Sequence, residues 1–208
     1  MAAFLQNFRN TMILSLILAL IMVFAFGSAY GRFDFMFWQA TFRWMHVFFG
    51  ILWIGLLYYF NFVAARKTPE IPAELRPALS KYITPEALFW FRWSALFTVL
   101  AGLGVIGLRA MQVPGYSAKV FTLGVYGGFG DRGKQFMLLG IGVYLALIMF
   151  INVWGVIWPN QKIALGIIEG DADAKAKAAR TAGMFSRINT LLSLPMLTSM
   201  AMYQTLFG

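Results

Sequence analysis

The residue best suited to carry chemistry is His46, the only histidine, in an apolar stretch from 42 to 63. On a helix of 3.6 residues per turn, Gly50 and Trp53 lie about 40° and about −20° from it, one and two turns further on. Imidazole is a common ligand of haem iron, and a glycine one turn away leaves space for a flat ring. These three residues are a candidate cofactor-binding group with His46 as iron ligand. The alternative is a histidine near a helix end that only hydrogen-bonds a neighbouring group.

A second set of polar residues lies near the inner ends of the apolar segments. Polar side chains in a membrane cost free energy, so each needs a structural or functional reason. By depth, we expect five of them to share a pocket for a small anion or a quinone headgroup: Asn61, Arg92, Asn152, Arg187 and Asn189. The alternative for Arg92, which Trp90 and Trp93 flank, is a side chain that extends to the lipid headgroups.

The composition indicates the elements that must position these residues. Hydrophobic residues make up 60% of the 208 positions and charged residues 12%, with a mean hydropathy of +0.71. Soluble domains contain about 45–50% apolar and about 25% charged residues. Segments in lipid satisfy their backbone groups as helices. We therefore expect an all-α integral membrane protein, a single domain over 1–208 that is surrounded by lipid. Its bundle of about five spans covers about 11–28, 37–64, 87–109, 135–158 and 184–207.

Basic residues predict the orientation of these spans. On the amino-terminal segment and the loops after the second and fourth spans lie nine Lys and Arg, against five on the opposite side. Because basic loops stay on the inner side, we expect the amino terminus inside and the carboxyl terminus outside. The net charge of +9 is thereby explained by topology, and no nucleic-acid partner is needed.

Residue types that the chain lacks exclude several kinds of metal and cofactor site. Without cysteine, the chain cannot attach haem c through CxxCH, hold an iron–sulfur cluster or ligate a metal by thiolate. One histidine and no acidic residue in the expected spans also exclude a zinc site. The absence of buried carboxylates argues against a proton-coupled transporter. No residue is assigned a catalytic role.

Four blocks carry a family resemblance: "MHVFFGILWIGLLYYFNFV" (45–63), "WFRWSALFTVLAGL" (90–103), "NVWGVIWPNQKIALG" (152–166) and "RINTLLSLPMLTSM" (187–200). In this order they resemble the membrane domain of the bacterial membrane-bound urate oxidase (urate hydroxylase) family. The resemblance implies an inner-membrane location and oxidation of urate, with electrons passed to a c-type cytochrome domain. Because this chain has no CxxCH, it implies a separate cytochrome c as partner.

A shorter similarity concerns His46 and the stretch "WIGLLYYFNF" (53–62). It resembles membrane haem proteins of the protoporphyrinogen-oxidase type, in which a histidine on such a helix is thought to hold b-type haem. The resemblance implies the same cofactor here, with the second iron position left to a methionine, a partner chain or water.

Two other functions stay open at this point. One is a noncatalytic accessory subunit that packs against a larger respiratory or photosynthetic membrane complex. The other is a transporter of small anions. The reason to consider it is that Arg92 and Arg187 lie among asparagines in the expected spans.

Overall fold

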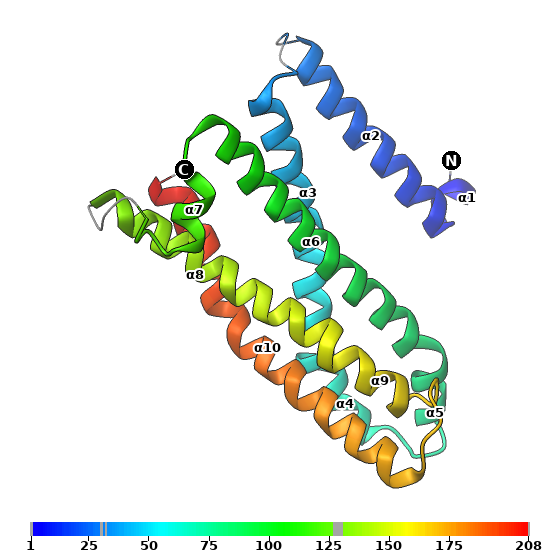
Figure 1. Ribbon diagram of the computed structural model, residues 1–208. Coiled ribbons are helices and arrows are strands. Elements are labelled where there is room, and N and C mark those ends of the chain that lie inside the picture. Colours follow the sequence, from blue (N-terminus) through cyan, green and yellow to red (C-terminus); the bar gives the residue numbers. More distant parts are fainter. Residues whose placement is uncertain (1, 30, 32, 127–130, 208) are drawn as a thin grey trace.

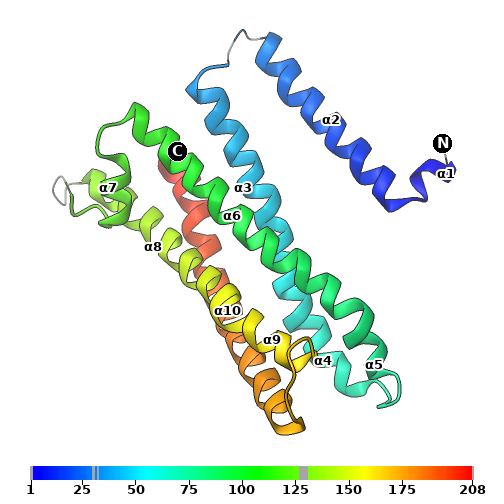
Figure 2. The same cartoon turned by 45° about the vertical axis from the view of Figure 1, so that its right-hand side comes forward.

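The computed structural model describes residues 2–29, 31, 33–126 and 131–207, and all regular structure in these ranges is helical (Figure 1). The all-α prediction is confirmed. The chain begins with a short helix, α1 (Ala2–Leu5), and a long one, α2 (Phe8–Ala29). In α2 only Gly27 is buried. Both views show α2 leaning away from the other long helices (Figures 1 and 2).

The first helical hairpin covers 35–112. Its descending arm consists of α3 (Phe35–Tyr58), the π-helical segment η1 (Tyr59–Ala64), α4 (Ala65–Lys67) and the 3₁₀ turn η2 (Thr68–Glu70). Its ascending arm consists of α5 (Arg76–Ala78), the π-helical segment η3 (Leu79–Ile83) and α6 (Thr84–Gln112). Asp34 caps the first arm by accepting a hydrogen bond from the Phe37 backbone at 3.0 Å. Arg76 closes the turn by donating to the backbone oxygens of Ile71 and Pro69, both at 2.8 Å.

The second hairpin follows the short helix α7 (Tyr116–Phe121). It descends through α8 (Asp131–Ile151), the π-helical segment η4 (Asn152–Ile157) and α9 (Trp158–Ala164), then returns as α10 (Ala172–Phe207). The left-handed backbone of Gly166, with φ of +73°, forms the turn after α9. The two arms lie side by side in both views (Figures 1 and 2).

Apolar side chains from both hairpins form the core. One cluster lies where α3, α6, η4 and α10 meet and includes Trp53, Leu57, Phe91, Val153 and Met196. A second cluster lies among α6, α7 and α8 and includes Ile106, Val120 and Phe136. The two hairpins are thus joined along their length, which brings residues far apart in sequence to the same depth.

Four helices of the described chain are long and apolar enough to cross a membrane: Phe8–Ala29, Phe35–Glu70, Arg76–Gln112 and Gly133–Ala164. Four of the about five expected spans therefore lie in helices that are long and apolar enough to cross a membrane. The fifth expected segment, 184–207, is the second part of α10, which has a charged first part and many Ser, Thr and Asn residues further on. The helices also extend past the expected spans, because apolar runs mark only the part of a helix that suits lipid.

Candidate functional site

His46 is tied to the opposite arm of its hairpin by one hydrogen bond. Its Nδ1 lies 2.8 Å from the backbone oxygen of Thr98, on α6. A carbonyl oxygen only accepts hydrogen bonds, so Nδ1 carries the proton and donates. The lone pair of the imidazole is then on Nε2, which has no hydrogen-bond partner among the described residues. A histidine held in this tautomer by a backbone carbonyl has the arrangement of a metal ligand.

Gly102 makes this contact possible. A side chain at Gly102 would begin only 2.9 Å from both Cε1 and Nδ1 of His46. Gly102 also follows Thr98 by four residues, so it lies over the carbonyl that the imidazole reaches. The missing side chain therefore gives His46 both the space for its ring and access to its acceptor.

Gly50 and Trp53 lie on the same stripe of α3 as His46, and both pack against neighbouring helices. The nearest atom to a side chain at Gly50 would be Cγ2 of Thr98, at 3.8 Å, which is ordinary contact distance. Trp53 is 1% exposed, within the core cluster. Its Nε1 is buried without a hydrogen-bond partner among the described residues. Both side-chain positions thus face neighbouring helices of the bundle.

Asn152 and Asn189 are brought together. Nδ2 of Asn152 donates to Oδ1 of Asn189 at 2.8 Å, and Nδ2 of Asn189 donates to the backbone oxygen of Met149 at 2.9 Å. Asn189 is completely buried. The pair joins η4 and α8 to α10, and interhelical amide bonds of this kind stabilise packing between apolar helices.

Asn61 contacts the same face of α10 one turn nearer the amino-terminal end of that helix. Its Nδ2 donates to Ser186 Oγ at 2.8 Å and to the backbone oxygen of Leu57 at 2.9 Å. One turn after Asn189 along α10, the hydroxyls of Ser193 and Tyr58 lie 3.0 Å apart. Together with the asparagine pair, these bonds form a polar seam along α10.

Two of these asparagines lie in π-helical segments, Asn61 in η1 and Asn152 in η4. A π turn inserts an extra residue and leaves backbone carbonyls without their usual partners. Asn61 donates to a carbonyl next to η1, that of Leu57. The wider turns thus let both amides reach α10.

The two arginines of the expected pocket lie apart from the seam. The Arg92 guanidinium carbon is 3.9 Å from the centre of the Trp158 ring and 5.3 Å from that of Phe89. Arg187 is exposed and has no hydrogen bond, ion pair or ring contact within the described part of the chain. The five residues therefore divide into a seam of three asparagines, a stacked arginine and an exposed one.

Sequence reasoning did not single out a group of residues at the end of the bundle that carries α7. The hydroxyls of Tyr116 and Tyr203 lie 2.9 Å apart. Arg43 on α3 and Arg109 on α6 have no hydrogen bond or ion pair with any described residue. Sequence spacing could have indicated that the two arginines share helix faces with the His46 contact. Arg43 precedes His46 by three residues, and Arg109 follows Gly102 by seven.

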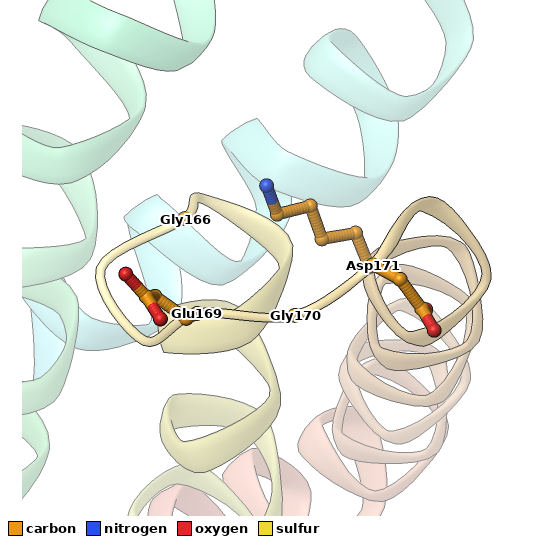
Figure 3. Close-up of a pocket in the computed structure, with 5 residues that line it drawn as sticks. Gly166, Glu169, Gly170 and Asp171 are labelled. Atoms are coloured by element: carbon orange, nitrogen blue, oxygen red, sulfur yellow. The ribbon is translucent and has the colours of Figure 1, made fainter.

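Cavities lie elsewhere. One of about 520 Å³ is formed by the loop between α9 and α10, lined by Gly166, Glu169, Gly170, Asp171 and Lys175. Figure 3 shows the Glu169 and Asp171 side chains pointing away from one another. Another, of about 380 Å³, separates α2 from α3. The described residues contain no cluster of three or more His, Asp or Glu that could hold a metal ion.

Comparisons with known proteins found no matching family model, curated protein or solved structure. The fold itself defines the class: an all-helical chain of two packed hairpins and an additional amino-terminal helix, with four helices suited to crossing a membrane.

Proposed function

We propose that this chain is a redox protein of the bacterial inner membrane that binds b-type haem through His46. The observation that carries the proposal is the hydrogen bond from Nδ1 of His46 to the Thr98 carbonyl, which leaves Nε2 free to bind iron. Bound haem would supply one-electron chemistry, and the protein residues would set its position and surroundings.

The residues around His46 fit such a ligand. The imidazole is held in one tautomer, and Gly102 provides the space for its ring. His46 as a whole is half-buried. It lies 11 residues into α3, or about 17 Å along the helix. With the amino terminus inside, as we propose, the iron ligand would lie in the outer half of the bundle, where an electron could pass to a cytochrome c on the outer face.

The reaction class rests on the family resemblance. Four blocks between 45 and 200 resemble the membrane domain of urate oxidases, which supports urate or a related purine as the electron donor. A separate cytochrome c is then the electron acceptor.

The test is a reduced-minus-oxidised absorption spectrum of the purified, detergent-solubilised chain, with pyridine haemochrome analysis. A b-type spectrum that is lost in His46→Ala, but kept in an exposed-surface variant such as Leu191→Ala, supports the proposal. A flat spectrum from folded wild-type protein expressed with ample haem refutes it. Urate-dependent reduction of the haem then tests the substrate separately.

A second function is favoured by one observation, the isolation of α2. Its side chains are apolar on every face, yet Gly27 is its only buried residue. An accessory subunit would cover this helix with a partner in a larger membrane complex. Stable co-purification with such a complex, without bound haem, would favour this reading. Anion transport gains no support from the geometry, because Arg187 is exposed and Arg92 is stacked on Trp158.

A further inference from the structure

Two positively charged side chains share one indole ring where α6 meets the second hairpin. The guanidinium carbon of Arg92, on α6, lies 3.9 Å from the centre of the Trp158 ring. Nζ of Lys162, on α9, lies 5.9 Å from the same centre. The two cationic groups are therefore less than about 10 Å apart, the sum of these distances. Both side chains are half-buried.

Contacts between tryptophans and α6 fix this arrangement. Nε1 of Trp154, four residues before Trp158, donates to the backbone oxygen of Arg92 at 3.2 Å. The Trp154 ring also meets the Trp93 ring edge-on, with the centres 5.6 Å apart. The backbone of the arginine and the ring on which its side chain stacks are thus held by the same helix contact. Lys162 follows Trp158 by one helical turn, which brings its ammonium group over that ring.

Neither cation is neutralised by the described chain. A single ion pair occurs within the described ranges, and it involves neither Arg92 nor Lys162. The two side chains make ring contacts there but no hydrogen bond. Glu86, the one acidic residue of α6, instead accepts a hydrogen bond from a tryptophan of its own helix at 2.9 Å. Two like charges this close repel one another, so an anion that contacts both lowers the energy.

Tryptophans mark the level in the membrane at which these cations lie. Four of the seven tryptophans of the chain surround Arg92. Trp90 and Trp93 are its neighbours on α6 and are 47% and 36% exposed, and Trp154 and Trp158 contact it from the second hairpin. Tryptophan is enriched where the hydrocarbon core meets the lipid headgroups. Long basic side chains near helix ends extend to this level, at which the phosphate groups of the lipids lie.

We infer that Arg92 and Lys162 form a phosphate-binding site for the headgroup of an anionic phospholipid. Phosphate oxygens accept charge-assisted hydrogen bonds from both guanidinium and ammonium groups. The exposed rings of Trp90 and Trp93 offer apolar surface to the adjoining part of the lipid. Basic residues between membrane helices bind anionic headgroups in this way. The inference does not depend on the proposed function, because neither cation takes part in the His46 contact.

The test compares two lipids that differ in headgroup charge. Native mass spectrometry of the full-length chain in neutral detergent measures its affinity for phosphatidylglycerol and for phosphatidylcholine with the same acyl chains, whose choline cancels the phosphate charge. We expect wild-type protein to bind phosphatidylglycerol about tenfold more tightly, because charge-assisted bonds are stronger than neutral ones. Arg92→Gln and Lys162→Gln should each reduce the preference to about threefold or less. Arg92→Lys keeps the charge and should retain more of it than Arg92→Gln.

Two other substitutions separate a specific site from diffuse attraction. Arg187→Gln and Lys177→Gln each remove one positive charge from an exposed side chain of the second hairpin. Both variants should keep the wild-type preference. An equal reduction in all four glutamine variants indicates attraction by net charge alone and overturns the inference. Equal affinity of the wild-type protein for the two lipids also overturns it, whatever the variants do.

Inorganic phosphate is another source of the same chemistry. It is titrated into the wild-type protein in detergent without lipid, and its binding is followed by tryptophan fluorescence. Binding that Arg92→Gln and Lys162→Gln both abolish, together with no preference between the two lipids, assigns the site to a free anion and overturns the lipid assignment. A lipid preference that depends on both residues, and that millimolar phosphate does not remove, supports the headgroup site.

Discussion

Nδ1 of His46 and the backbone oxygen of Thr98 lie 2.8 Å apart, although 52 residues separate them in the chain. This bond joins the two arms of the first hairpin and sets the tautomer of the single histidine. It depends on a third residue, Gly102, because any side chain there would meet the imidazole.

Gly102→Ala should displace the His46 ring, since the added Cβ would lie 2.9 Å from two ring atoms. We expect most of the His46-dependent haem content to be lost, as measured by pyridine haemochrome per mole of protein. Gly107→Ala is the matched control on the same helix, because nothing lies within 4 Å of its added Cβ. Equal haem content in both variants would contradict the role assigned to Gly102.

Asn189→Ala should destabilise the fold because it removes the acceptor of Asn152 and the donor to the Met149 carbonyl. We expect a loss of about 1–2 kcal/mol in the free energy of unfolding, measured in mixed micelles. Leu191→Ala, at a side chain that is 73% exposed on the same helix, should change it by less than about 0.5 kcal/mol. A loss that is no larger for Asn189 than for Leu191 would show that the amide pair contributes nothing.

Gly142→Ala should push α8 and α10 apart. The added Cβ would lie 2.7 Å from Ser199 Oγ and 3.1 Å from its Cβ, while this hydroxyl donates to the backbone oxygen of Leu138. We expect a cost of about 1–3 kcal/mol in the free energy of unfolding.

A second substitution, Ser199→Gly, should recover part of that cost, which a double-mutant cycle measures. Gly155→Ala is the control, with its nearest neighbour at 3.9 Å. Additive effects of the Gly142 and Ser199 changes would argue against their direct contact.

Alkaline pH should weaken the end of the bundle that carries α7 through Tyr116, whose pKa is raised by burial and by its bond to Tyr203. Above about pH 10, the unfolded chain loses the tyrosine proton while the folded chain keeps it. The stabilisation is therefore complete below about pH 10 and decreases as the pH rises toward the raised pKa of the folded state. Tyr116→Phe should show a smaller fall of the thermal midpoint between about pH 9 and about pH 11. An unchanged slope would refute this assignment.

Apolar runs and helical periodicity predicted much of the fold. Four expected spans correspond to helices, and the stripe of His46, Gly50 and Trp53 does lie along one face of α3 toward its neighbours. The fifth expected span was harder to assess, because α10 combines a charged first part with a seam of polar side chains whose partners lie on other helices.

The sequence by itself determined the helical class, the position of each polar residue along its helix and the presence of one imidazole, since these follow from local composition and from 3.6 residues per turn. Only the tertiary structure decided which residues meet. It paired Asn152 with Asn189, placed Arg187 away from both, and set Gly102 against His46. The physical reason is that depth and helix face are local properties, whereas contact between helices depends on their rotation and on where glycines permit close approach.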